Sequence, residues 1–112
     1  PEAGWDDETN PTAVVLDYPT SGKVERRVAF TAKMFNPEPA KGPDAAWSFE
    51  KIFGDGDFIG AGQLVIPVGK RKPRKDTKDN TFIFHVVEGA VKVVVCDTRF
   101  VLATGGMFMV PR

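Results

Sequence analysis

A run of basic side chains between residues 70 and 78 is the most concentrated chemical feature of the sequence. Six of its nine positions carry a cation and Asp76 alone carries an anion; the cations are Lys70, Arg71, Lys72, Arg74, Lys75 and Lys78. Such a run can bind DNA phosphates, with an affinity that falls steeply as salt rises, or an acidic protein segment. No aromatic residue is interleaved to stack on bases, so DNA contact is expected to lack sequence readout. A solvated loop is the alternative.

The first twenty residues have the opposite character. They contain no Lys or Arg and five acids, which are Glu2, Asp6, Asp7, Glu8 and Asp17. Over the whole chain, 15 basic residues balance 15 acidic ones, so net charge identifies no partner. The distribution predicts an acidic arm and a basic loop on one neutral domain, and the loop could contact the chain's own Asp6, Asp7 and Glu8.

Catalytic and metal-binding chemistry has little support in the remaining residues. His85 is the single histidine, and a lone imidazole neither builds a metal site nor acts as a base without a partner. Cys96 is the single cysteine, which excludes an intrachain disulfide and fits a reducing compartment; packing on an apolar strand is its expected role. The segment 54–57 resembles part of a calcium loop but lacks the later carboxylates, so a turn is predicted there.

The pattern of apolar residues and breakers predicts an all-β chain. Short strands with Gly-rich turns favour a sandwich or barrel, and they are expected at 47–53, 58–68, 81–87, 90–96, 99–103 and 107–110. Residues 1–46 are expected to form an N-terminal extension that packs on or beside a barrel of residues 47–112. No apolar run approaches the length of a membrane-spanning helix, so no membrane contact is predicted.

The strands at 81–87 and 90–96 are predicted to form a hairpin around Glu88-Gly89. Alternation then places the side chains of Phe82 and Phe84 inside the barrel, and the side chains of the residues between them on its outer surface. Apolar side chains on an outer face indicate a partner, with cover by residues 1–40 as the alternative. A continuous outer patch is therefore expected to be a homodimer interface, made of Ile83, His85, Val87, Val94 and Cys96.

Two glycine-led stretches have the spacing of the signature motifs of cupin barrels. Gly89 stands where the first motif ends, and Gly105 and Pro111 have the spacing that opens the second. The positions of the metal-binding His-x-His pair and Glu fall on Asp76, Lys78 and Phe82. A transition metal needs imidazole, thiolate or carboxylate ligands that converge on one point. No metal or cofactor is therefore predicted, and Phe82 is expected to fill the barrel interior in place of a ligand.

A more specific resemblance lies in the residue strings themselves. Five stretches closely resemble the C-terminal cupin of the CENP-C family, especially its fungal members: Trp47–Asp55, Ile66–Lys75, Lys78–Phe82, Val87–Val91 and Leu102–Arg112. The segments 15–18 and 26–31 resemble the region just before that cupin. The resemblance implies a cupin-like jelly-roll barrel with an N-terminal extension. The family's upstream nucleosome-binding motif is not found, because Trp5 stands in no basic context.

The family resemblance implies a non-enzymatic homodimerisation module of an inner-kinetochore scaffold at centromeric chromatin in the nucleus. Its expected partners are a second copy, other kinetochore or centromere assembly proteins, and chromatin indirectly. The alternatives are a barrel that binds DNA or an acidic partner through residues 70–78, a metal-dependent cupin enzyme, and a small-molecule-binding barrel. The family barrel continues beyond the position of Arg112, so either further strands or another chain is expected to complete the pairing.

Overall fold

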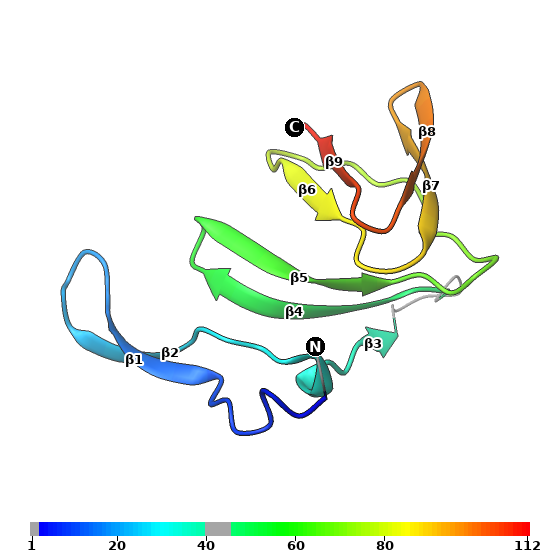
Figure 1. Ribbon diagram of the computed structural model, residues 1–112. Coiled ribbons are helices and arrows are strands. Elements are labelled where there is room, and N and C mark those ends of the chain that lie inside the picture. The colour runs from blue at the N-terminus through cyan, green and yellow to red at the C-terminus, as the bar shows by residue number, and fades with distance from the viewer. Residues whose placement is uncertain (1–2, 40–45) are drawn as a thin grey trace. The chain divides into compact units, whose positions relative to one another are not determined.

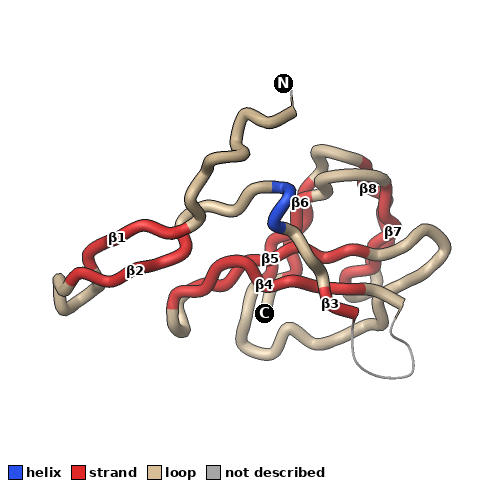
Figure 2. The backbone as a smooth tube through the Cα atoms, turned by 90° about the horizontal axis from the view of Figure 1, so that it is seen from below, coloured by secondary structure: helices blue, strands red, loops and turns tan. Residues whose placement is uncertain are grey.

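The alternating residues form short strands throughout the computed structural model, which describes residues 3–39 and 46–112 (Figure 1). The described elements, in chain order, are β1 (Thr12–Leu16), β2 (Lys23–Arg27), the 3-10 turn η1 (Ala32–Met34), β3 (Glu38–Pro39), β4 (Ser48–Asp55), β5 (Ile59–Val65), β6 (Phe82–His85), β7 (Ala90–Val95), β8 (Thr98–Ala103) and β9 (Met107–Val110). Apart from η1, the regular elements in Figure 2 are strands, which confirms the predicted all-β class. Within the described ranges, no helix is long and apolar enough to cross a membrane.

The strands pair into four antiparallel sheets, with the orders β1-β2, β3-β4-β5, β6-β9 and β7-β8. The chain divides into two compact units, of which the first ends at Lys72 and the second is Pro73–Arg112. The first unit holds β1 to β5 and the second holds β6 to β9. The boundary falls inside the basic run. The division into an extension of residues 1–46 and a barrel of residues 47–112 stays a prediction.

In the first unit, two arginines fix the β1–β2 hairpin to strand β4. The Arg26 guanidinium donates to the Gly54 carbonyl at 2.7 Å, and the Arg27 guanidinium donates to the Ile52 carbonyl at 2.9 Å. A two-stranded hairpin is marginally stable by itself in water. These charge-assisted bonds therefore contribute to holding the N-terminal hairpin in place.

The β4–β5 pair contains a bulge at its centre. The register shifts between Lys51 and Phe53, so that Ile52 is the extra residue of β4. Ile52 is also the one apolar side chain that is buried in the described part of the chain, with 8% exposure. Opposite the bulge, a Cβ atom at Gly62 would lie 2.3 Å from the Glu50 carbonyl oxygen. The glycine is needed here because the backbone of β4 approaches β5 too closely for a side chain.

In the second unit, the predicted hairpin between residues 81–87 and 90–96 is wrong. Strand β6 pairs with β9 and strand β7 pairs with β8. The Val86 N–H donates to the Gly106 carbonyl and the Gly105 N–H donates to the Val86 carbonyl, which prolongs the β6–β9 ladder. The Thr104 hydroxyl then accepts from the Gly89 N–H at 3.0 Å. These hydrogen bonds hold residues 86–89 against the turn between β8 and β9. The chain therefore does not fold back to pair with β6.

Aromatic rings join the two sheets of this unit. The rings of Phe84 and Phe108, which face each other across β6 and β9, stack with their centroids 4.6 Å apart. Phe100 of β8 meets Phe108 edge-on at 5.9 Å, and Phe82 meets Phe84 edge-on at 6.1 Å. Aromatic pairs in these geometries add to the free energy of burial. The phenylalanine faces of the two sheets are therefore the inner faces of the unit.

The turn between β7 and β8 contains Cys96, which was predicted to lie on a strand. Val95 and Thr98 form the last pair of the ladder, so Cys96 and Asp97 make a two-residue turn. Cys96 has a φ of 52° and is exposed. Tight hairpin turns favour glycine at positions of positive φ, because any other side chain is strained there.

Replacing Gly62 with alanine should lower the free energy of unfolding by about 1–3 kcal/mol, because the added methyl group has no space. The matched change is Gly60→Ala in the same strand. There the nearest atom would be 3.6 Å away, at the end of the flexible Lys51 side chain. That variant should unfold at the urea concentration of the wild type or slightly above it. Equal destabilisation of the two variants would contradict the close approach.

Replacing Cys96 with glycine should raise the free energy of unfolding by about 1 kcal/mol, because it removes the strain of a Cβ atom at positive φ. Cys96→Ala is the control, since it removes the thiol and keeps the Cβ. Urea denaturation of both variants separates the two effects. A gain of the same size in the alanine variant would show that the thiol, and not the backbone, is responsible.

Candidate interaction site

An uncharged outer face on β6 and β9 is the strongest candidate for a functional surface. Ile83 lies directly across from Met109, and His85 lies directly across from Met107. Directly paired residues project from the same face of a sheet. Ile83, Met107 and Met109 are 67%, 60% and 55% exposed. Neither strand contains Asp, Glu, Lys or Arg. We call these four residues the β6–β9 outer face.

The five residues predicted as a dimer interface are distributed over two sheets and their connections. Ile83 and His85 belong to the β6–β9 outer face, and Val87 follows β6 in an exposed position. Val94 lies on β7, and Cys96 lies in the turn after it. Because the inner faces of the two sheets meet at Phe100 and Phe108, the outer faces point away from each other. One continuous patch was expected only because 81–87 and 90–96 were expected to pair.

Sequence reasoning did not identify Met107 and Met109 as members of this surface. The alternation within residues 107–110 was available as a signal, since Met107 and Met109 occupy every second position. The register that sets them beside His85 and Ile83 could not be inferred, because it joins strands that are not adjacent in the sequence.

The basic run does not form a single surface of free cations. The Arg74 guanidinium donates to the Cys96 carbonyl at 2.5 Å, and the Lys72 ammonium lies 5.0 Å from the centre of the Trp47 ring. Although the basic run itself contains no aromatic residue, the fold brings the Trp47 ring next to Lys72. The remaining cations, which are exposed, are Lys70, Arg71, Lys75 and Lys78.

The acidic arm makes a contact outside the basic run. The Asp7 carboxylate forms an ion pair with the Lys33 ammonium of η1. Trp5, beside it, is exposed. The acidic residues Asp6, Asp7 and Glu8 were suggested to contact the basic loop. The Asp7 carboxylate could do so only by giving up its ion pair with Lys33.

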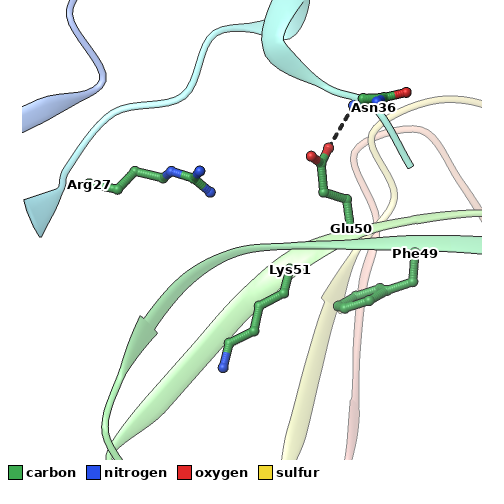
Figure 3. A pocket seen from close by; sticks show the side chains of 5 residues that line it. All are labelled: Arg27, Asn36, Phe49, Glu50 and Lys51. Atoms are coloured by element: carbon green, nitrogen blue, oxygen red, sulfur yellow. Dashed lines mark hydrogen bonds between the residues drawn. The ribbon is translucent and has the colours of Figure 1, made fainter. Parts of the chain in front are cut away.

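A small cavity of about 280 Å³ in the first unit carries no evident chemistry. Figure 3 shows the five lining residues, which are Arg27, Asn36, Phe49, Glu50 and Lys51. The Glu50 carboxylate accepts from the Asn36 backbone N–H at 2.7 Å, and Arg27 is bonded to the Ile52 carbonyl. The Glu50 carboxylate and the Arg27 guanidinium are therefore engaged with the fold, and the lining offers no nucleophile beside a base.

The positions that bear metal ligands in cupins have other surroundings here. Phe82 lies on the same side of β6 as Phe84 and contacts its ring, so this position contributes to the aromatic cluster. Asp76 and Lys78 lie in the loop before β6 and are exposed. Across residues 3–39 and 46–112, no group of three or more His, Cys, Asp or Glu side chains gathers as a metal site would require.

Comparisons with known proteins identify the family. Residues 47–112 match the family model described as Mif2/CENP-C like. This is more than half of the chain, so the chain belongs to the CENP-C family, as its residue strings predicted. The inner kinetochore subunit cnp3 of Schizosaccharomyces pombe is 34% identical over 64 residues, which are 57% of this chain and 10% of the relative. The chain thus matches about a tenth of the length of that relative.

A solved structure identifies the fold. The Schizosaccharomyces pombe Cnp3 cupin domain matches with a TM-score of 0.81 and 28% identity, over 90% of this chain and 69% of the solved chain. The predicted cupin-like fold is therefore confirmed. Within the described residues the strands form four separate sheets rather than one closed sheet.

Proposed function

We propose that this chain is a non-enzymatic homodimerisation module of a kinetochore scaffold protein, and that it acts at the centromere in the nucleus. Membership of the CENP-C family and similarity to an inner kinetochore subunit support the setting. Other kinetochore or centromere assembly proteins are the proposed further partners, with centromeric chromatin reached indirectly.

The β6–β9 outer face is the observation that carries the proposal. Every residue of the second unit is described, and none of its side chains is fully buried. A unit of this size with two two-stranded sheets needs further apolar contact to be stable. A second copy laid on this face would cover Ile83, Met107 and Met109 of both chains. Burial of such a side chain is worth about 1.5–3 kcal/mol.

A two-fold axis through the β6–β9 outer face would make the interface self-complementary. The face is apolar and carries no fixed charge, so two copies can approach without repulsion. A stable interface buries about 800 Å² per partner, which is more than four side chains provide. The face is therefore proposed as the centre of a larger contact, with Val87 close to it in sequence.

Dimerisation by itself can provide the function of a scaffold. Joining two weak chromatin-binding arms converts the second binding event into an intramolecular one, and this typically raises affinity by about 10²–10⁴-fold. A non-enzymatic role agrees with the side chains at the metal-ligand positions of cupins, since Lys78 and Phe82 are not metal ligands and Asp76 alone does not make a site. A dioxygenase-like or isomerase-like cupin would require such ligands.

The change Ile83→Glu with Met109→Glu should convert the dimer into a monomer. Each buried, unpaired carboxylate costs several kcal/mol, so the dimer dissociation constant should rise by at least about 100-fold. Light scattering over a dilution series should change from near twice 12.3 kDa to 12.3 kDa. Circular dichroism would verify that the variant folds.

Val94→Glu with Val101→Glu on β7 and β8 is the matched control, because it adds the same charge to the opposite outer face. It should leave the dimer intact. Dissociation by this control alone would move the interface to β7–β8. A wild-type chain that is monomeric at low micromolar concentration would show the dimer proposal to be wrong.

Contact with DNA or an acidic partner through the basic loop is the second candidate function, supported by the four exposed cations. Replacing them with alanine should weaken binding to duplex DNA at low salt and reduce the salt slope by up to about four. Lys72 and Arg74 are left unchanged because they contact Trp47 and the Cys96 carbonyl. The control removes three cations that lie outside both the basic loop and strands β7 and β8, at Lys23, Lys51 and Arg112. Equal loss in both variants, or no DNA binding by the wild type, would exclude a DNA contact specific to this loop.

A further inference from the structure

The outer face of β7 and β8 differs in chemistry from that of β6 and β9. Val94 lies directly across from Arg99, and Lys92 lies directly across from Val101. Directly paired residues share a face, so these four side chains form a two-by-two array with a cation and a valine in each pair. Val94 and Val101 are 52% and 63% exposed, and Lys92 and Arg99 are also exposed. We call this array the β7–β8 outer face.

The charge on this face has one sign. Neither β7 nor β8 contains Asp or Glu, and the nearest acids in sequence, Glu88 and Asp97, stand in the flanking connections. At the turn that ends the hairpin, the Arg74 guanidinium is held by its bond to the Cys96 carbonyl. A third cation is thereby fixed at the same end of the hairpin as the Val94–Arg99 pair, and Asp97 is the one acid in that turn.

The two valines distinguish this face from a solvated patch of cations. On each strand, a cation and a valine occupy successive outward positions, Lys92 with Val94 and Arg99 with Val101. A complementary surface must therefore offer carboxylates and apolar side chains in alternation. An extended segment provides this arrangement, because side chains on one face of a strand recur at every second residue.

We propose that the β7–β8 outer face is a docking surface for an acidic segment of a partner protein that carries apolar side chains between its carboxylates. Charge complementarity would bring the segment to the face and fix its register, and contact with Val94 and Val101 would add apolar burial. The proposal does not require the dimer, since this face points away from the β6–β9 outer face. Duplex DNA fits less well, because phosphates would leave both valines exposed.

The test uses the full 112-residue chain and a fluorescein-labelled extended probe peptide. Along one face of this peptide, at positions 1, 3, 5 and 7, an acidic residue (Glu or Asp) alternates with an apolar one (Val or Leu). A peptide of the same composition, with its acids and apolar residues in two separate blocks, is the control ligand. Fluorescence anisotropy at 50 mM salt should show binding of the alternating peptide at least tenfold tighter than that of the block peptide. Equal affinities would overturn the proposed geometry.

Three variants locate the surface. Lys92→Glu with Arg99→Glu should weaken binding at least tenfold, and Val94→Ser with Val101→Ser should weaken it about threefold or more at unchanged charge. Lys70→Glu with Arg71→Glu, which changes net charge by the same amount in the basic loop, should have little effect. Loss of affinity in this last variant equal to that in the first would assign the binding to the loop. Tighter binding of a duplex DNA of matched charge, lost in the first variant, would assign the face to nucleic acid.

Discussion

The contact of Phe108 with both Phe84 and Phe100 is the interaction on which the second unit depends. Phe84 and Phe108 come from the paired strands β6 and β9, and Phe100 comes from the other sheet. No hydrogen-bonded ladder joins β6–β9 to β7–β8, so ring contacts must define which face of each sheet is inner. Once the phenylalanine faces are inside, alternation determines that Ile83 and Met109 point out on one side and Val94 and Arg99 on the other. The properties of both outer surfaces follow from this choice.

Alternation predicted the inward side of β6 and β7, although Phe82, which was expected to fill the barrel interior, is 42% exposed. Phe84, Val91 and Val93 are less exposed than Ile83, Lys92 and Val94, in agreement with the period of two. Strand pairing could not be predicted in the same way, because Glu88-Gly89 has the composition of a tight turn. In the structure Val86 forms backbone hydrogen bonds with Gly105 and Gly106, and the Gly89 N–H donates to the Thr104 hydroxyl, fifteen positions away. Long-range bonds of this kind leave no local signal in a sequence.

The candidate site was predictable only in part, because alternation within a strand can be seen in the sequence and the register between distant strands cannot. Ile83 and His85 could be identified from their own strand, whereas Met107 and Met109 required the register of β9. Cys96 was placed on the wrong element, because an apolar run ending in cysteine gives no sign of the positive φ that begins the turn. Likewise Trp47 reaches Lys72 only through the fold of the first unit. The family resemblance was recognisable because it depends on residue strings and not on contacts.

The opposite orientation of the two outer faces determines how many partners an assembly can hold. If two copies join through β6–β9, each contributes its β7–β8 face to the outside, so the pair is divalent toward an acidic ligand. A ligand with a single matching segment would then bind with two-to-two stoichiometry. A ligand with two such segments would bridge neighbouring pairs into chains, and the local concentration of the module would decide between discrete complexes and extended arrays.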